Sequence, residues 1–337
     1  MKKQKIENKI KSIKGKTIAI VYIFEGDNES GFEHFFVWKG NIISLWLNAI
    51  YNIKCLPLIL DVRTFVDKAI SGTLPHIDFV INLNSGTKDL SVMSLIPSVC
   101  SSIGIPCIPC NANAIITGEN KKTSNHIARS IGLKVPNDLN KDSEGGIFRP
   151  INLGNSMGVK RELDNNNDGI YQEFIYGYDI TTPLVFNPIT QKIDVLPTVL
   201  YIPDSHDNSW FNGEQEKLSR SGYSMKCIQL DSNLKQKYID LSKEIMTKTF
   251  CRIDSRISSS INPLDIHTAS IDETYFVEIN VMPTIREFNN FVFSFNSISE
   301  SNDFSIIKEL QKKIFNCSDI HTFLLINSIL SLEPCTE

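Results

Sequence analysis

The segment TYFVEINVMP, residues 274–283, places a carboxylate and an amide two positions apart in an otherwise apolar run. Its threonine, aromatic and β-branched residues favour extended backbone, so the run predicts a β-strand. Because successive side chains of a strand point to opposite faces, we expect Glu278 and Asn280 to share one face. Val277 and Ile279 should point away from that face. Two oxygen-bearing side chains on one face of so apolar a strand require an explanation in terms of what they contact.

A second polar pair precedes this segment in CRIDSRI, residues 251–257, where Arg252 and Asp254 also stand two positions apart. If the two strands pair, the four polar side chains can form one patch. Carboxylate and amide oxygens are the hard ligands that Mg²⁺ prefers, and magnesium usually accompanies substrate phosphates. An adjacent arginine can stabilise a phosphoryl group or an oxyanion. A hairpin with its polar residues on a solvated face explains the same spacing, so both interpretations stay open at this point.

The length and composition are those of a globular chain with about two or three compact units. Of the 337 residues, 42% are hydrophobic and 21% are charged, and the formal net charge is −4. Such a charge argues against nucleic acid or an anionic membrane as a main partner. The basic N-terminus lacks the apolar core of a secretion signal, and no run approaches the roughly 18 apolar residues of a membrane span. Together with eight cysteines, mostly in apolar segments, these features predict a cytoplasmic protein.

The first part of the chain, residues 1–113, alternates strand-like apolar runs with helix-like segments. Strands are expected at 16–26, 54–62, 76–86 and 105–110, and helices at 41–53 and 90–104. This alternation predicts a doubly wound α/β domain with a parallel sheet. The spacing of Ile6, Ile10 and Ile13 allows a short helix before it, with a solvated tail as the alternative. No G-x-G-x-x-G occurs here, so a dinucleotide-binding fingerprint is absent.

Two further regions follow, with expected boundaries at 114–178 and 179–337. The first has two short helices before Pro136 and strand-like runs at 146–151, 157–163 and 169–175. The second has a hairpin at 179–187 and 192–201, a helix at 234–250, the strand pair described above, and amphipathic helices at 303–316 and 319–331. Residues 203–224 are too polar and irregular for a core element, and a loop of this length is usually functional or mobile.

A glycine-containing loop lies between two of these strands in RPINLGNSMGVK, residues 149–160. Gly154 and Gly158 let backbone N–H groups approach a phosphate closely. An ordinary hairpin turn is the other interpretation, and the motif alone does not separate the two.

The order of these features along the chain resembles that of the ATP-grasp ligases, and more specifically the D-alanine–D-alanine ligase family. The resemblance extends from about residue 105 to residue 290 and is strongest in four blocks: IGIPCIPCNANAIITGENKKTSNHIARSIGLKVP, FRPINLGNSMGV, YQEFIYGYDIT and RID…FVEINVMP. It implies an ATP-grasp fold, of mixed α/β and α+β class, with an N-terminal doubly wound parallel-sheet domain before it.

The resemblance also implies a nucleotide site. The residues expected at the phosphates of ATP are Lys121, Arg149, Gly154, Asn155 and Ser156. The residues expected around the adenine base form a hinge, namely Gln172, Glu173, Phe174 and Ile175, and Asp179 takes the ribose position.

Metal-binding and catalytic roles are implied in the same way. Asp254, Glu278 and Asn280 are expected to hold two Mg²⁺ ions, for which Mn²⁺ can substitute. The residues expected to act in catalysis are Arg252, Arg149, Ser156 and Lys217, the last in a mobile lid formed by the loop 203–222.

The implied reaction is the ATP-dependent joining of a carboxylic acid to an amine. Attack of the carboxylate on the γ-phosphorus makes an acyl phosphate, an amine attacks the acyl carbon, and ADP and phosphate are released. Arg252 is placed to stabilise the tetrahedral oxyanion, and the lid keeps water off the acyl phosphate. The partners expected are therefore ATP and small-molecule substrates. A homodimer is an expectation from the resemblance alone.

Several positions depart from the family pattern. Arg149 replaces a lysine, Asn155 replaces a serine, and Thr284 replaces a glycine. IREFNN (285–290) replaces the segment that holds the carboxylate of the second D-alanine, and NLNSGTKD (82–89) replaces a His-Gly segment. The early substrate-binding glutamate has three candidates, Glu25, Glu29 and Glu33.

Apart from Arg149 and Asn155, the nucleotide and metal positions are kept, whereas the segments expected to form the amino-acid pockets are rewritten. We therefore expect a substrate pair other than two D-alanines. Two interpretations of Arg286 stay open: it binds a substrate carboxylate, or it is a surface arginine. The alternatives are D-alanine–D-alanine ligase itself and a catalytically silent ATP-binding regulatory protein.

Overall fold

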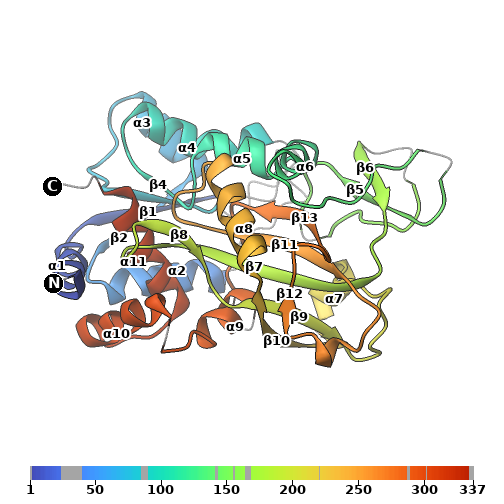
Figure 1. Ribbon diagram of the computed structural model, residues 1–337. Helices are drawn as coiled ribbons and strands as arrows, with labels where there is room; N and C mark the ends of the chain where they lie inside the picture. Colours follow the sequence, from blue (N-terminus) through green and yellow to red (C-terminus); the bar gives the residue numbers. More distant parts are fainter. Residues whose placement is uncertain are drawn as a thin grey trace.

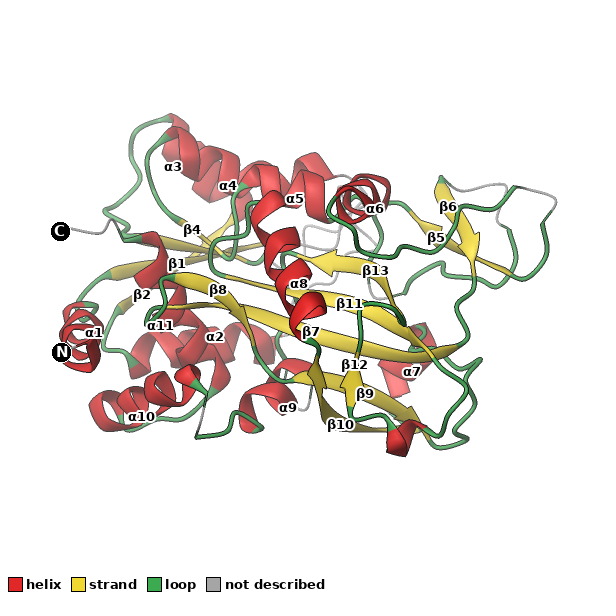
Figure 2. Ribbon diagram, in the orientation of Figure 1, coloured by secondary structure: helices red, strands yellow, loops and turns green. Residues whose placement is uncertain are grey.

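The computed structural model arranges the chain as three sheets with helices packed around them (Figures 1 and 2). The structure describes residues 2–23, 40–84, 90–140, 143–154, 156–163, 168–219, 221–286, 289–300 and 302–333. A helix with the length and apolar character needed to cross a bilayer is not found among these residues.

The N-terminal domain is built on a parallel sheet in the strand order β2-β1-β3-β4. Its strands are β1 (Thr17–Tyr22), β2 (Leu56–Asp61), β3 (Phe79–Asn82) and β4 (Cys107–Ile108). The predicted parallel sheet is thereby confirmed, although each strand is shorter than the apolar run that predicted it. β4 keeps only two residues because prolines flank it, at Pro106 and Pro109, and proline has no N–H for the ladder.

Helices cover both faces of this sheet: α1 (Lys2–Ser12), α2 (Gly40–Asn52), α3 (Val62–Ile70) and α4 (Leu90–Ser102). Ile18 and Ile20 of β1 pack in the cluster that contains α1 and α2. Ala19 and Val21 pack in the cluster that contains α3 and α4. Burial on both faces is the reason that the strand is apolar throughout.

Two of these helices bear on the sequence analysis. The helix allowed by Ile6, Ile10 and Ile13 is formed, and all three side chains are buried. α3 was not predicted. It follows β2 without a glycine or proline between them, and the Asp61 side chain caps it by accepting from the Arg63 N–H at 2.9 Å.

The central segment consists of two short helices and a two-stranded antiparallel sheet: α5 (Ala112–Gly118), α6 (Lys121–Ser130), β5 (Gly146–Pro150) and β6 (Gly169–Glu173). The strand predicted at 157–163 is wrong. Only Lys160 pairs with β5 there, through its backbone N–H and carbonyl to Phe148 at 3.1 and 2.7 Å. A single bridge forms because the backbone turns there: Ser156 and Gly158 have left-handed φ values of +59° and +68°, and the Val159 N–H donates to the Ser156 carbonyl at 3.2 Å.

The largest sheet has the order β12-β10-β9-β7-β11-β13, with β8 paired to β7. Its strands are β7 (Gly177–Asn187), β8 (Lys192–Val195), β9 (Thr198–Pro203), β10 (Tyr223–Leu230), β11 (Phe250–Ser258), β12 (Thr268–Ala269) and β13 (Thr274–Asn280). The hairpin of β7 with β8 is confirmed. The run predicted as one strand at 192–201 is divided at Pro197, beyond which β9 pairs with β10 and a different part of β7. β10 was not predicted.

Helix α8 (Ser232–Glu244) crosses one face of this sheet (Figure 1). Leu234, Tyr238 and Leu241 are its buried residues, in one cluster with the inner side chains of β11 and β13. The helix is shorter than the predicted 234–250, because Met246 has a left-handed φ of +63° and Phe250 already belongs to β11.

Three helices close the chain: α9 (Asn290–Asn296), α10 (Asp303–Phe315) and α11 (Ile320–Leu332). α11 contacts α2 of the N-terminal domain, β7 of the large sheet, and α9 and α10. All of its residues from Ile320 to Leu330 are buried. The expectation that it would be amphipathic is therefore wrong, because the helix is enclosed between the two sheets and the neighbouring helices.

Candidate active site

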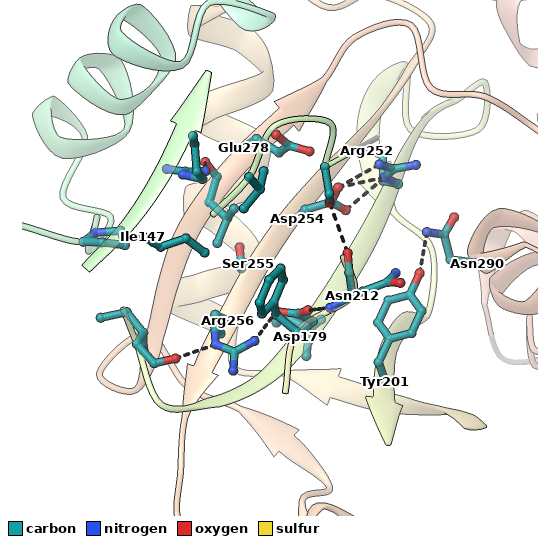
Figure 3. A pocket seen from close by; sticks show the side chains of 18 of the residues that line it. Ile147, Asp179, Tyr201, Asn212, Arg252, Asp254, Ser255, Arg256, Glu278 and Asn290 are labelled. Carbon is teal, nitrogen blue, oxygen red and sulfur yellow. Dashed lines mark hydrogen bonds and ion pairs between the residues drawn. The ribbon is translucent and has the colours of Figure 1, made fainter. Parts of the chain in front are cut away.

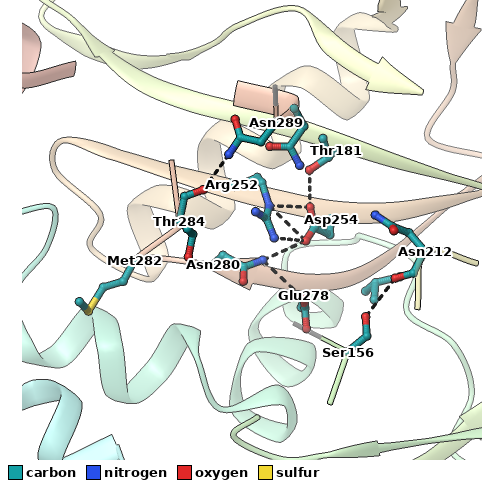
Figure 4. Close-up of polar contacts among 12 residues, drawn as sticks. Ser156, Thr181, Asn212, Arg252, Asp254, Glu278, Asn280, Met282, Thr284 and Asn289 are labelled. Atoms are coloured by element: carbon teal, nitrogen blue, oxygen red, sulfur yellow. Dashed lines mark hydrogen bonds and ion pairs between the residues drawn. The ribbon is translucent and has the colours of Figure 1, made fainter. Parts of the chain in front are cut away.

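The polar patch predicted from residues 251–283 forms where β11 pairs with β13. In this antiparallel pair Arg252 lies opposite Asn280, and Asp254 lies opposite Glu278. Figure 4 shows the four side chains together on one side of the two strands. The Arg252 and Asp254 side chains are only 15% and 22% exposed, so the patch is not the wet face of a hairpin.

A β-bulge on β13 changes one detail of that prediction. Asp254 pairs with Glu278 but the next residue, Ser255, pairs with Phe276, so Val277 is the extra residue. Val277 consequently lines the same pocket as Glu278, whereas Ile279 is buried in the core behind the sheet. The expectation that Val277 would point away is wrong, because side chains alternate only while the ladder is regular.

Asp254 is the most strongly bonded carboxylate of the patch (Figure 4). Arg252 donates to it from Nε at 2.9 Å and from Nη2 at 2.7 Å. Thr181 of β7 donates to its Oδ1. Asn280 Nδ2 donates to Asp254 Oδ2 at 3.0 Å and to Glu278 Oε1 at 3.5 Å. Burial lowers the pKa of the Arg252 guanidinium, but the charge and hydrogen bonds of Asp254 together with the nearby Tyr201 and Glu278 outweigh burial, so the pKa is raised and Arg252 stays protonated.

Lys121, the first residue of α6, brings a buried ammonium group to this patch. Its Nζ lies 3.3 Å from Glu278 Oε2 and donates to the Leu153 carbonyl at 2.7 Å. The helix begins here because the Asn120 side chain accepts from the Thr123 N–H at 3.0 Å. The cap thus fixes the position from which the lysine reaches Glu278.

Arg149 approaches the patch from β5. Its Nη1 donates to the Val277 carbonyl at the bulge, at 2.7 Å, and its Nη2 donates to Gln172 Oε1 at 2.6 Å. Burial lowers the pKa of Arg149, and the charge of Glu278 opposes that shift. Arginine remains protonated in proteins even so, and Arg149 therefore holds a fixed positive charge between the small sheet and β13.

Glu119, just beyond α5, holds the chain immediately after the patch. Its Oε1 accepts from the Val281 and Met282 N–H groups at 2.9 and 3.4 Å. Burial raises the pKa of the Glu119 carboxyl to about 7, with the Val281 N–H acting in the opposite direction.

The predicted hinge between β6 and β7 contributes a largely apolar wall. Phe174 is buried, and its ring centroid lies 6.2 Å from that of Phe211, in the loop that follows β9. The Arg161 guanidinium lies over the same ring, 3.6 Å from its centroid. Ile147 and Val159 line the pocket nearby. A slot of this shape and polarity suits a flat aromatic ligand.

Arg256 is a site residue that the sequence analysis missed. It is 5% exposed, and its Nη1 donates to Asp179 Oδ1 at 2.6 Å. Its other bonds go to four backbone carbonyls, those of Ile175, Gly177, Asn208 and Trp210. The signal was present in CRIDSRI, where Arg256 continues the two-residue spacing of Arg252 and Asp254.

The loop 203–222, which contains α7 (Glu214–Ser219), closes over the glycine-containing loop. Asn212 N–H donates to Asp179 Oδ2 at 2.7 Å, and Ser156 Oγ donates to the Asn212 carbonyl at 3.1 Å. Ser156 has a left-handed φ of +59°, which turns its side chain toward that loop. Asp179 is thus bonded by Arg256 and Asn212.

A single pocket joins these groups (Figure 3). The predicted site residues that line it are Lys121, Arg149, Ser156, Gln172, Glu173, Phe174, Ile175, Asp179, Arg252, Asp254 and Glu278. Asn280 contributes through its bonds to the two carboxylates, and Gly154, although described, does not line the pocket. Asn155, the Lys217 side chain and the candidates Glu25, Glu29 and Glu33 lie outside the described parts of the structure.

The donor set of the patch fits magnesium. Within the described ranges no group of three or more His, Cys, Asp or Glu is placed to hold a metal ion. Asp254 and Glu278 nevertheless face one another closely enough for the single amide of Asn280 to contact both. Two carboxylates suit Mg²⁺, which commonly takes few protein ligands and completes its shell with water and phosphate oxygens. Asn280 would add its oxygen with the amide turned over from the orientation in which Nδ2 donates to the carboxylates.

Comparison with solved structures identifies the fold. The chain is similar to D-alanine–D-alanine ligase from Bacillus anthracis complexed with ATP, with 16% identity, a TM-score of 0.57, and coverage of 90% of this chain and 99% of that one. It is similar to the VanG D-Ala:D-Ser ligase from Enterococcus faecalis, with 14% identity, a TM-score of 0.57 and coverage of 94% and 99%. D-alanyl-alanine synthetase A from Vibrio cholerae gives 13% identity, a TM-score of 0.60 and coverage of 90% and 99%. No family model and no curated sequence matches the chain.

The protein therefore has an ATP-grasp fold with a parallel-sheet domain at its N-terminus. More particularly, its fold is that of the D-alanine–D-alanine ligases, at low sequence identity. Both expectations of fold from the sequence resemblance are confirmed.

Proposed function

We propose that this protein is an ATP-dependent carboxylate–amine ligase that forms an amide through an acyl phosphate and releases ADP and phosphate. The observation that supports it most directly is the convergence of Lys121, Arg149, Arg252, Asp254 and Glu278 from separate elements on one pocket. Two carboxylates beside the buried Lys121 and Arg149 and the partly buried Arg252 form the charge pattern that phosphoryl transfer requires.

The nucleotide lies along the pocket from the hinge to the patch. The adenine base occupies the slot beside Phe174 and Ile175, and the ribose lies by Asp179. Lys121 and Arg149 contact the phosphates, and Ser156 and its neighbours, including Gly154 and Asn155, cover them. Lys217 belongs to the lid.

Asp254, Glu278 and Asn280 would hold Mg²⁺, which would neutralise charge on the phosphate groups of ATP. The carboxylate substrate attacks the γ-phosphorus while Lys121 and Arg149 balance the charge of the transferring group. The amine then attacks the acyl carbon, and Arg252 stabilises the tetrahedral oxyanion. The closed loop 203–222 keeps water from the acyl phosphate.

The substrate pair differs from two D-alanines. The segment after β13 departs from the family in sequence, and Asn289 holds it by accepting from the Val292 N–H at 3.2 Å and donating to the Thr284 carbonyl at 2.8 Å. Arg286 is half-buried and lines the pocket, so a surface role is the weaker interpretation and a substrate carboxylate is its proposed ligand.

The test is Mg²⁺-dependent ADP release from the purified protein with a panel of amino acids and other small acids and amines, with products identified by mass spectrometry. ADP release that requires both an acid and an amine, together with an amide product, supports the ligase. ATP binding without turnover across the panel supports a regulatory ATP-binding protein instead, and the absence of ATP binding rejects both.

A further inference from the structure

The far end of the pocket, beyond Arg252, holds a tyrosine and an asparagine that face each other. Tyr201 belongs to β9 and its side chain points into the pocket, and Asn290 is the first residue of α9 (Figure 3). Asn290 Nδ2 donates to the Tyr201 hydroxyl oxygen at 2.9 Å. Both residues line the pocket and both are at least nine-tenths buried, at 7% and 8% exposure.

Each member of this pair has one polar group unused. Asn290 Oδ1 is buried and has no hydrogen-bond partner in the described structure. The Tyr201 hydroxyl accepts from Asn290, and no described residue accepts its proton. Burial raises the pKa of Tyr201, which keeps the hydroxyl protonated and therefore a donor. A buried polar group without a partner is unfavourable, which points to a ligand that completes the bonding.

The unused groups define what that ligand must offer. As placed, the pair presents two donors, the Tyr201 O–H and the second Nδ2–H of Asn290, and one acceptor, Asn290 Oδ1. If the amide of Asn290 turns over, the tyrosine donates to the asparagine, Nδ2 presents the donors and the tyrosine oxygen presents an acceptor. A carboxylate has acceptors only, and an alkyl group has neither. A hydroxyl supplies a donor and an acceptor from one atom, whereas a primary carboxamide supplies them from two separate atoms, as the pair presents them from two residues.

The residues around Tyr201 and Asn290 disfavour a ligand that places a second charged group at this position. Tyr223 stacks edge-on against Tyr201, with ring centroids 5.3 Å apart, and Met225 lines the same region. The nearest ionised groups, Arg252 and Asp254, are engaged with each other. The position next to Arg252 is also where the nucleophile must lie to attack an acyl carbon.

We propose that Tyr201 and Asn290 select the amine substrate by binding a primary carboxamide group on it. This inference rests on the proposed ligase function and assigns one of its two unnamed substrates to a chemical class. Their proposed role is in substrate specificity and not in the chemical step, because the phosphates are assigned to Lys121 and Arg149 and the oxyanion to Arg252.

The experiment uses two sets of amines that share a shape and differ in the group presented. Asparagine, aspartate and leucine form one set, in both enantiomers. Alaninamide, alanine and 3-methyl-2-butylamine form the other, so that the result does not depend on where the carboxamide is attached. Each is assayed for ADP release and product mass with the full-length protein, Mg²⁺, ATP and the acid that supports the highest turnover in the panel above.

We expect kcat/KM to be at least about tenfold higher for the carboxamide in one set than for both its analogues, because a mismatched ligand leaves a buried group unpaired. Tyr201→Phe and Asn290→Leu should each remove most of that preference through the KM of the amine, with the KM of ATP unchanged. Tyr238→Phe, which removes another buried hydroxyl, bonded to Ser255 at 2.6 Å and outside the pocket, should keep the preference.

Equal rates for the members of both sets, or a preference that survives Tyr201→Phe and Asn290→Leu in variants that melt cooperatively, overturn the inference and leave the ligase function standing. A failure of the function itself looks different. No acid and amine pair then yields ADP from the wild-type protein, and the inference fails with it.

Discussion

Glu278 shows how one carboxylate connects several parts of the site. It pairs with Asp254 across two strands, lies 3.3 Å from the buried ammonium of Lys121, and contacts the amide of Asn280. The sequence spacing gave its face of the strand correctly. The same spacing placed Val277 on the wrong face, because a bulge is a property of the pair of strands and not of either strand alone.

Glu278→Gln should abolish ATP turnover while the protein still folds. The substitution keeps the shape of the side chain but removes the charge that faces Lys121 and that would help to hold Mg²⁺. We expect ADP release to fall by at least about 100-fold, as for loss of a major electrostatic group. The measurement is steady-state ADP release beside a thermal melt. Retained turnover in a folded variant would remove Glu278 from the site.

Glu119 gives a prediction about pH. Its folded-state pKa of about 7 lies above the ordinary value of 4.5, so the folded protein binds a proton more tightly than the unfolded chain. Its contribution to stability is therefore complete at low pH and is lost as the pH rises through about 7. Such a shift corresponds to at most roughly 3 kcal/mol.

Glu119→Gln should flatten this part of the pH profile, because glutamine cannot titrate and its carbonyl can still accept from the Val281 N–H. The measurement is urea unfolding between pH 5 and pH 8 for the variant and the wild type. If the difference in unfolding free energy between the wild type and the variant stayed constant from pH 5 to pH 8, it would show that Glu119 does not titrate there.

At the scale of elements, Arg256 links three segments that are distant in sequence. It joins β11 to the hinge through the carbonyls of Ile175 and Gly177, and to the loop 203–222 through those of Asn208 and Trp210. The loop is therefore held by main-chain acceptors, which impose no sequence requirement. This is the reason that inspection of the loop gave no sign of its anchor.

Arg256→Met should loosen that loop. It removes the side-chain donor to four carbonyls and to Asp179 Oδ1, and we expect a loss of about 2–4 kcal/mol in the free energy of unfolding. We also expect faster proteolysis within 203–222 and a higher KM for ATP. Urea unfolding measures the change in stability, limited proteolysis with mass spectrometry measures the exposure of the loop, and ADP release at varied ATP concentration gives the KM.

Arg129→Met is the matched control, since Arg129 is an exposed arginine that pairs with Asp138 at 3.2 Å and donates to the Pro136 carbonyl at 2.9 Å, and neither partner belongs to the loop 203–222. A surface pair of that kind contributes at most about 1 kcal/mol. Equal protease sensitivity of the two variants at 203–222 would contradict the anchoring role of Arg256.

At the scale of the whole molecule, α11 connects the N-terminal domain to the large sheet. Phe323 is fully buried, with its ring centroid 5.1 Å from that of Phe295 and 5.8 Å from that of Phe304. The helix also packs on α2, so a core element of the N-terminal domain is completed by the last segment of the chain. The sequence pattern gave a helix here but not its surroundings.

Phe323→Ala should therefore destabilise both sheets together. Deleting a buried phenylalanine ring costs about 3–5 kcal/mol. We expect a single unfolding transition, shifted to lower denaturant by the same amount when followed by far-ultraviolet circular dichroism and by tryptophan fluorescence. Trp46 of α2 reports on the junction, since its ring stacks on Phe250 of β11 and packs edge-on against His321 of α11. Two separated transitions would show that α11 does not couple the domains.

The sequence by itself determined the alternating strands and helices of the first domain, the pairing of β11 with β13, and the residue types at the proposed nucleotide and metal positions. These follow from periodicities of two and 3.6 residues and from local motifs, which a single segment carries within itself. The tertiary structure alone decided the bulge at Val277, the anchoring of the loop by Arg256, the burial of α11, and the meeting of Tyr201 with Asn290. Each of these depends on a partner far along the chain, and no local pattern encodes the register or the identity of a partner that only folding brings into contact.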